Sequence, residues 1–257
     1  ANPINEVLVN TTNIPIDVTY VITPIANGCA GPAFNYVVTV DPTPTVSSVN
    51  ADTVCSGEVQ DYLITSPVAG ATFTWTRAAV AGISNAPAIG QTSNPITEAL
   101  INTTNVPVNV EYVIIPSANG CITGPAFTYT VTVNPVANIT SSGTTVTCNN
   151  TPLNYNITSA VAATSYTWSR NDVTGISNAA VSGQTVNPIM ESLQNTTSAP
   201  VVVPYYIVGT ANGCENPDTF VLNVTVYPTA TLSSSLTDTV CSAVALNHTL
   251  TSPVAGT

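Results

Sequence analysis

Residues 110–134 read VEYVIIPSANGCITGPAFTYTVTVN, and this stretch decides the expected fold. It contains two runs, Val110 to Ile115 and Phe127 to Val133, that are apolar throughout or alternate apolar with polar residues. Such runs indicate β-strands, because alternate side chains of a strand point to one face of a sheet. Asn119-Gly120 lies between them and supplies the positive φ angles of a tight turn. The stretch therefore predicts a β-hairpin, and Asn134-Pro135 predicts its end, because proline cannot donate a ladder hydrogen bond.

The same pattern occurs more than once along the chain of 257 residues. Three short motifs each occur three times, with copies 92 or 93 residues apart. They start at residues 27, 119 and 212 for Asn-Gly-Cys, at 10, 102 and 195 for Asn-Thr-Thr, and at 2, 94 and 187 for Asn-Pro-Ile. Trp75 matches Trp168 in the same register, and Arg77 matches Arg170. A period near 93 residues suits one small β-sandwich domain.

Prolines that follow three alternating strands mark the expected joints between the repeats. Residues 1–42 are expected to be the C-terminal part of an incomplete repeat. Residues 43–134 and 135–227 are two complete repeats, and residues 228–257 are the N-terminal part of a further one. No stretch shows sustained helical periodicity. The predicted fold class is all-β, in the form of tandem immunoglobulin-like β-sandwich domains of about 93 residues each.

The composition excludes several classes of function. Charged residues make up 6% of the chain, against roughly 25% in an average soluble domain. The formal net charge is −11, and the only cations are Arg77 and Arg170. Nucleic acid is therefore not an expected partner, because phosphate binding needs clustered lysine and arginine. No apolar run approaches the roughly 18 residues of a membrane span, so no membrane insertion is expected.

Six cysteines indicate an oxidising compartment, provided that they pair. Each complete repeat has two, separated by the same 66 residues; these are Cys55 with Cys121, and Cys148 with Cys214. We predict disulfides within each repeat, because each domain should be stable alone, and each bond should contribute about 4 kcal/mol. Pairing across repeats, such as Cys29 with Cys55, is the alternative. Intradomain pairing leaves Cys29 and Cys241 with partners outside this chain, either in adjoining repeats or in neighbouring copies joined head to tail.

No catalytic group and no metal site can be named. The one histidine, His248, has no counterpart in the other repeats, and no nucleophile lies in a recognisable relation to it. No Cys-x-x-Cys occurs, and no phosphate-binding glycine loop is present, so no metal and no cofactor are expected. The sequence therefore predicts that the chain is not an enzyme.

The matched tryptophans and arginines permit two interpretations each. Trp75 and Phe73 alternate on one face of a strand, which favours a core indole, while a sugar-stacking platform is the alternative. Arg77 and Arg170 share that face but stand at the strand end. We expect them to extend outward and to pair with a carboxylate such as Asp172 or Glu98.

The pattern Cys…Trp-Thr-Arg…Asn-Thr-Thr…Val-Glu-Tyr-Val-Ile…Asn-Gly-Cys…Tyr-Thr-Val-Thr-Val-Asn-Pro spans one repeat. It resembles the immunoglobulin-like, PKD-like modules of very large Bacteroidota surface proteins, which are associated with gliding motility and type IX secretion. The resemblance implies an extracellular or cell-surface location and a structural repeat region that forms a stalk or a filament. An adhesin or a carbohydrate-binding module is the alternative. The implied partners are adjoining repeats or neighbouring copies of the chain, in a head-to-tail arrangement among others.

Two kinds of glycosylation site are candidates. Asp52-Thr53-Val54 and Asp238-Thr239-Val240 resemble the Asp-Ser/Thr-aliphatic acceptor of Bacteroidota O-glycosylation, which implies Thr53 and Thr239 as acceptors. A plain aspartate turn is the competing interpretation. The three Asn-Thr-Thr motifs are sequons for N-glycosylation. Their acceptor residues are Asn10, Asn102 and Asn195. Descent from one ancestral repeat also explains their recurrence.

Overall fold

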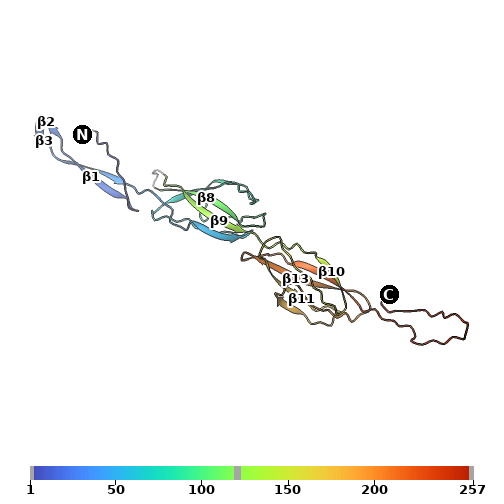
Figure 1. Ribbon diagram of the computed structural model, residues 1–257. Coiled ribbons are helices and arrows are strands. Elements are labelled where there is room, and N and C mark those ends of the chain that lie inside the picture. Colours follow the sequence, from blue (N-terminus) through green and yellow to red (C-terminus); the bar gives the residue numbers. More distant parts are fainter. Residues whose placement is uncertain (1–2, 119–122, 255–257) are drawn as a thin grey trace. The chain divides into compact units, whose positions relative to one another are not determined.

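The computed structural model describes residues 3–118 and 123–254. Within them every regular element is a β-strand, so the predicted all-β class is confirmed (Figure 1). The chain divides into two compact units, Ala1–Asn134 and Pro135–Thr257. The expected Asn119-Gly120 turn lies outside the described residues.

One sheet of five strands forms the frame of the first complete repeat. The strands are β5 (Ala51–Cys55), β6 (Thr72–Arg77), β7 (Ala88–Gln91), β8 (Val108–Ser117) and β9 (Phe127–Asn134). Their order across the sheet is β5-β9-β8-β6-β7. Strand β8 is antiparallel to β9 and to β6, whereas β5 runs parallel to β9. The predicted strands Phe73 to Arg77, Val110 to Ile115 and Phe127 to Val133 are thus confirmed, each with bounds one or two residues wider.

A second, looser layer covers one face of this sheet. It consists of two segments that contact each other through isolated bridges, Val59 with Ala99 and Tyr62 with Ile96. The predicted strand from Tyr62 to Thr65 is therefore only a single bridge. The core lies between the layers; among its fully buried members are Ile96, Leu100, Val110, Tyr112, Ile114, Tyr129, Val131 and Val133. Alternate residues of β8 and β9 supply six of its thirteen buried members, because alternate side chains of a half-buried strand face the core.

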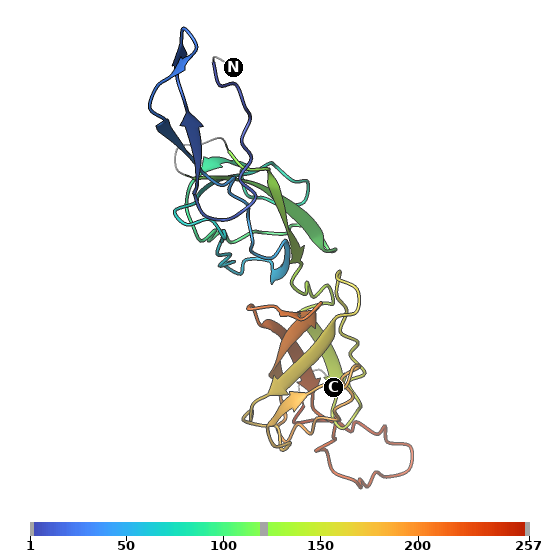
Figure 2. The same ribbon diagram turned by 90° about the vertical axis from the view of Figure 1, so that its left-hand side faces the viewer.

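The second complete repeat has the same plan. Its strands are β10 (Thr144–Cys148), β11 (Ser165–Arg170), β12 (Val181–Gln184), β13 (Val201–Ala211), β14 (Cys214–Glu215) and β15 (Phe220–Tyr227). The order is β10-β15-β13-β11-β12, with β14 paired to the end of β13. Strand β10 is parallel to β15, as β5 is to β9. In Figure 2 these strands run from yellow-green to red-brown.

The two incomplete ends have little regular structure. Residues before Pro42 contain the antiparallel pair β1 (Ile16–Ile22) and β4 (Phe34–Val40), and the short hairpin β2 (Ile25–Ala26) with β3 (Cys29–Ala30). Residues 228–254 contain no strand. Side chains that are core in a complete repeat stay open here: Tyr36 is 48% exposed, whereas its counterpart Tyr129 is 0% exposed.

Candidate functional site

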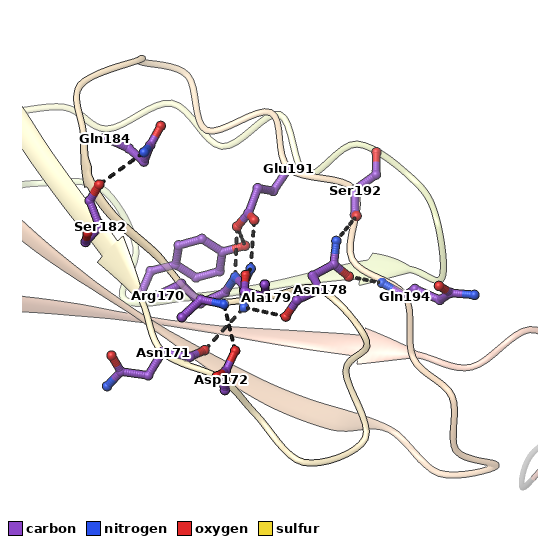
Figure 3. A network of polar contacts seen from close by, with 12 residues as sticks. Arg170, Asn171, Asp172, Asn178, Ala179, Ser182, Gln184, Glu191, Ser192 and Gln194 are labelled. Carbon is purple, nitrogen blue, oxygen red and sulfur yellow. Dashed lines mark hydrogen bonds and ion pairs between the residues drawn. The ribbon is translucent and has the colours of Figure 1, made fainter.

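Each complete repeat buries one arginine at the end of a central strand. Arg77 ends β6 and is 1% exposed, and Arg170 ends β11 and is 0% exposed. The Nε and Nη2 atoms of Arg77 donate to the two carboxylate oxygens of Glu98, both at 2.9 Å. Arg170 binds Glu191 in the same way, at 3.0 and 2.9 Å (Figure 3). Two parallel charge-assisted bonds of this kind fix both the distance and the orientation of the pair.

Backbone carbonyls accept hydrogen bonds from the guanidinium N–H groups that do not bind the glutamate. Arg77 Nη2 donates to the Ala86 carbonyl at 2.6 Å, and Arg170 Nη2 to the Ala179 carbonyl at the same distance. The expected pairing of Arg77 with Glu98 is confirmed, but the expected outward orientation of both arginines is wrong. The planar guanidinium can be buried because the following loop turns its carbonyls inward and accepts the remaining donors. Asp172 accepts a hydrogen bond from the Ala180 backbone amide instead.

A buried tyrosine completes each ion pair. The Tyr112 hydroxyl donates to Glu98 Oε2 at 2.7 Å, and the Tyr205 hydroxyl donates to Glu191 Oε2 at 2.6 Å. The repeats differ in the next contact. Gln60 donates through Nε2 to the Tyr112 hydroxyl at 2.6 Å, and its Oε1 atom is buried without a hydrogen-bond partner in the described part of the chain. Leu153 occupies the matching position of the second repeat.

The network shifts the pKa values of its members. Burial raises the pKa of Glu98, but the hydrogen bonds from Arg77 and Tyr112 outweigh it, so this carboxyl titrates below its usual range. The hydrogen bonds to Glu98 raise the pKa of Arg77. Burial, and then the hydrogen bond to the carboxylate, raise the pKa values of Tyr112 and Tyr205. The Arg77, Glu98 and Tyr112 cluster is therefore held in one charge state at neutral pH, which suits a structural role and not proton transfer.

The two tryptophans are core residues, as predicted. Trp75 is 4% exposed and Trp168 is 5% exposed. Each indole Nε1 donates to a backbone carbonyl at 2.9 Å, that of Ser93 for Trp75 and that of Val186 for Trp168. An indole held in this way is not available as a sugar-stacking platform.

The Asn-Thr-Thr motif forms a clasp on the last strand of each repeat. Asn102 Nδ2 donates to the carbonyls of Val106 and Val133, both at 2.8 Å, and its Oδ1 accepts from the amide and the hydroxyl of Thr104. The same four bonds recur in the other copies. They join Asn10 to Ile14, Val40 and Thr12, and Asn195 to Ala199, Val226 and Thr197. A glycan on this nitrogen would replace one of the amide hydrogens, and Asn102 and Asn195 are both buried. This role was not predicted from the sequence, although the recurrence of all three residues of the motif indicates it.

The candidate O-glycosylation residues have a common local geometry. Thr53 lies on β5 and is exposed, and its backbone amide donates to Asp52 Oδ1 at 2.7 Å. Thr239 is also exposed, and its amide donates to Asp238 Oδ1 at 2.8 Å. The modification of these two exposed residues stays a prediction.

The cysteines do not follow the predicted scheme. Cys55 and Cys214 are each part of a disulfide, whereas Cys29, Cys148 and Cys241 are exposed free thiols. The predicted bond between Cys148 and Cys214 is therefore wrong. Cys121 lies outside the described residues, so its bond to Cys55 stays a prediction. The expected partners of Cys29 and Cys241 outside this chain stay a prediction.

The length of one strand explains why Cys148 and Cys214 cannot meet. Cys148 lies opposite Tyr227, beyond the Val201 end of β13, and Cys214 lies opposite Ala211, at the other end of that strand. Strand β13 has 11 residues, and at about 3.3 Å per residue it separates the two cysteines by about 30 Å. A disulfide needs Cα atoms within about 7 Å.

The described residues contain no constellation that would bind a metal. Within residues 3–118 and 123–254, no three histidine, cysteine, aspartate or glutamate side chains lie close enough together to hold an ion. Over the same residues, no helix is long and apolar enough to cross a membrane.

Comparisons with known proteins agree with this architecture. The model of the PKD-like domain family matches residues 1–44, 52–137 and 145–230. A comparison with curated protein sequences finds no match. Many solved structures are similar, among them three tandem β-sandwich proteins. Drosophila N-cadherin EC1-3 is 9% identical over 86% of this chain and 91% of its own, with a TM-score of 0.26. Human protocadherin-24 EC1-2 is 10% identical over 73% and 99%, with a TM-score of 0.34. Chicken CNTN1 FN1-FN3 is 10% identical over 82% and 76%, with a TM-score of 0.33.

TM-scores this low carry no argument about function. The family match covers most of the chain, and its three segments follow the repeats described above. The chain belongs to the PKD-like domain family, as a tandem array of immunoglobulin-like β-sandwich repeats.

Proposed function

We propose that this chain is a structural repeat region of a secreted or cell-surface protein, and that it acts as a spacer in a stalk or an extracellular filament. Its resemblance to modules of large Bacteroidota surface proteins makes that group the proposed context. The supporting observation is that the two complete repeats use matching charged and aromatic side chains in the same internal way. The arginine, glutamate, tyrosine and tryptophan of each repeat all bond within its own fold.

Side chains that are buried and hydrogen-bonded inside the fold are not available for ligand binding or catalysis. Arg77 and Arg170 are the only strong cations of the chain, and both are buried and paired with carboxylates. Their charge is thus not available to recognise an anionic substrate. A repeat that keeps its shape and presents a Thr- and Asn-rich surface without exposed arginine or lysine is suited to separating other domains.

An extracellular location fits the cysteine chemistry. Two of the described cysteines are in disulfides, and such bonds persist in oxidising compartments. The proposed partners are adjoining repeats or neighbouring copies of this chain, because the core side chains of residues 1–42 are open to solvent and need a cover. Tyr36, at 48% exposure, is the clearest of them.

Exposed aromatic residues do not favour the adhesin alternative. Phe34 and Tyr36 are exposed, but they occupy the positions of Phe127 and Tyr129, which pack in or against the core of the complete repeat. Their exposure reflects the incomplete repeat and not a flat platform for sugars.

Two measurements test the proposal. Antibodies raised against the folded chain should label intact cells that make the protein, and a protease added outside should remove the label. Labelling that appears only after permeabilisation would contradict an extracellular role. The purified chain should also bind no sugar on a glycan array; saturable binding that an Asp52→Ala or Thr53→Ala variant retains and a Tyr36→Ala variant loses would favour the adhesin alternative.

A further inference from the structure

Glu6 and Tyr20 form two thirds of the polar cluster that each complete repeat buries. The Tyr20 hydroxyl donates to Glu6 Oε2 at 2.8 Å, and Tyr112 makes the same bond to Glu98 in the first complete repeat. There, Arg77 also binds the carboxylate through two hydrogen bonds. No arginine binds Glu6 in the described part of the chain, since both arginines of the sequence are paired with other glutamates. This cluster therefore has its carboxylate and its tyrosine but lacks a guanidinium.

The strand that carries Tyr20 has one open edge. Strand β1 pairs with β4 in the register in which β8 pairs with β9, so that Tyr20 lies opposite Tyr36 as Tyr112 lies opposite Tyr129. The other edge of β8 is occupied by β6, which carries the arginine. Within residues 3–118 and 123–254, no strand pairs with that edge of β1. An open edge presents unpaired N–H and C=O groups to which a further strand can be added.

Apolar side chains of β1 are open where those of β8 are covered. Ile22 is 39% exposed, whereas Ile114, at the matching position of β8, is 0% exposed. In the complete repeat Ile114 lies opposite Trp75 of β6, and the Trp75 ring contacts that of Tyr112 edge-on. Strand β6 thus supplies both an aromatic cover and a cation to the face that is open on β1.

We propose that the open edge of β1 binds an antiparallel strand with the pattern aromatic-x-Trp-x-Arg, supplied by a further PKD-like repeat. Both complete repeats have this pattern in their arginine strand, and both use one register. The arginine lies opposite the tyrosine of the cluster, and the tryptophan lies opposite an isoleucine. In the same register the bound arginine lies opposite Tyr20 and donates to Glu6, and the tryptophan covers Ile22.

Charge favours this occupant over an apolar strand. The chain has a formal net charge of −11, and both of its arginines are already buried and paired. A strand that brings its own guanidinium gives the Glu6 carboxylate the two parallel charge-assisted bonds that its counterparts have. The inference rests on the proposed function for one point, that neighbouring repeats cover residues 1–42. Strand binding and cell-surface location are measured separately, so the failure of one is distinguishable from the failure of the other.

A synthetic peptide of residues 71–93 is the probe, because it contains β6, β7 and the loop between them. It carries Trp75, Arg77 and the Ala86 carbonyl that accepts from the guanidinium. With a dye on its N-terminus, its fluorescence anisotropy should rise to saturation when the full chain is added. An Arg77→Met peptide should bind at least tenfold more weakly, because methionine cannot make the two bonds to the carboxylate.

A matched pair of chain variants identifies the acceptor. Glu6→Gln should weaken binding of the unchanged peptide at least tenfold, whereas Glu111→Gln, at an exposed glutamate of β8, should leave it unchanged. The Arg77→Met peptide should bind the Glu6→Gln chain and the wild-type chain equally, because the two changes remove the same interaction. Glu6 is exposed, so its substitution should not alter the urea unfolding of the complete repeats, which their tryptophans report.

Amide hydrogen exchange locates the bound peptide. Backbone amides of Ile16–Ile22 should exchange more slowly when the peptide is bound, because the added strand pairs with the open edge of β1. Protection confined to Phe34–Val40 would place the peptide on the wrong strand and overturn the proposal. Binding that tolerates both Arg77→Met and Glu6→Gln, or no binding at about 1 mM peptide, would overturn it as well.

Discussion

The buried ion pair of the first repeat should behave as one energetic unit. Arg77→Met would remove both guanidinium bonds of Glu98, whose side chain is 23% exposed and can regain water. Glu98→Leu would instead leave the arginine, at 1% exposure, charged and without its carboxylate. Breaking a buried pair from one side costs about 3–5 kcal/mol. We expect Arg77→Met at the lower end of this range and Glu98→Leu at the upper end or above it.

The double variant Arg77→Met/Glu98→Leu should recover most of the loss. Apolar side chains of similar volume often replace a buried ion pair with little change in stability. The Tyr112 hydroxyl loses its acceptor, but Gln60 has a buried Oε1 atom without a partner, and a turn of its amide lets it accept this hydrogen. We expect the double variant within about 2 kcal/mol of the wild-type chain, and a coupling energy of about 3 kcal/mol or more.

Each complete repeat carries its own reporter for this measurement. The chain has two tryptophans, and Trp75 lies 5.6 Å from Tyr112 between ring centroids. In a Trp168→Phe background, urea unfolding followed by fluorescence reports on the first repeat alone. The double-mutant cycle then gives the coupling energy from four midpoints and slopes.

The second repeat supplies the contrast. Leu153 replaces Gln60 there, so Arg170→Met/Glu191→Leu leaves the Tyr205 hydroxyl without an acceptor in its network. A buried unsatisfied hydroxyl costs about 1–3 kcal/mol, so this double variant should recover less. A loss below about 1 kcal/mol for both single variants of the first repeat, or equal recovery in the two repeats, would refute the reasoning.

Three further outcomes are expected. Asn102→Ala removes both donors of the clasp and should destabilise the first repeat by about 2–4 kcal/mol in urea unfolding, whereas exposed Asn105→Ala should change it by less than about 0.5 kcal/mol. The pKa of Glu98 is lowered in the folded state, so its carboxylate adds stability that is present above the ordinary value of about 4.3 and is lost as the pH falls through the folded value. The unfolding midpoint of Glu98→Gln should therefore fall less between pH 7 and pH 3 than that of the wild type; an equal fall would contradict the assignment. Gly175→Ala should lower the Tm of the second repeat, because φ is +92° and the new Cβ would lie 2.8 Å from a threonine methyl carbon, while Gly183→Ala, at φ +62° with nothing within 4 Å, should show only the smaller backbone penalty.

The strands and the repeat were predictable because both depend on local pattern. Alternation along Phe127 to Val133 identified β9, and the proline after Asn134 marked its end. The weaker strand expected at Tyr62 became a bridge, because the chain there pairs with its neighbour at single residues only. The strand propensity of the residues and the period of their apolar–polar alternation describe one strand at a time. They do not specify how many residues of two segments pair with each other.

The polar interior was predicted less well, because it depends on tertiary contacts. Composition gives an arginine at a strand end a high chance of facing water, yet Arg77 is buried, since Glu98 and the loop carbonyls converge on it from distant parts of the chain. The spacing of Asn102 from Thr104 fits a glycosylation sequon as well as it fits a structural motif, and in the folded chain the two residues form the hydrogen-bonded clasp. Cysteine spacing failed for a related reason: 66 residues separate Cys148 from Cys214, but the strand order places them at opposite ends of β13.

The parallel pairing of the first and last strands has a mechanical consequence. When tension acts on the two ends of a repeat, it pulls on the start of β5 and on the end of β9, and these lie at opposite ends of the paired region from Ala51 with Thr130 to Cys55 with Asn134. The load is therefore directed along the strands and is shared by all of their inter-strand hydrogen bonds at once, instead of opening them one after another as in a zipper. A chain of such repeats should resist stretching up to a high force and then yield abruptly, one repeat at a time.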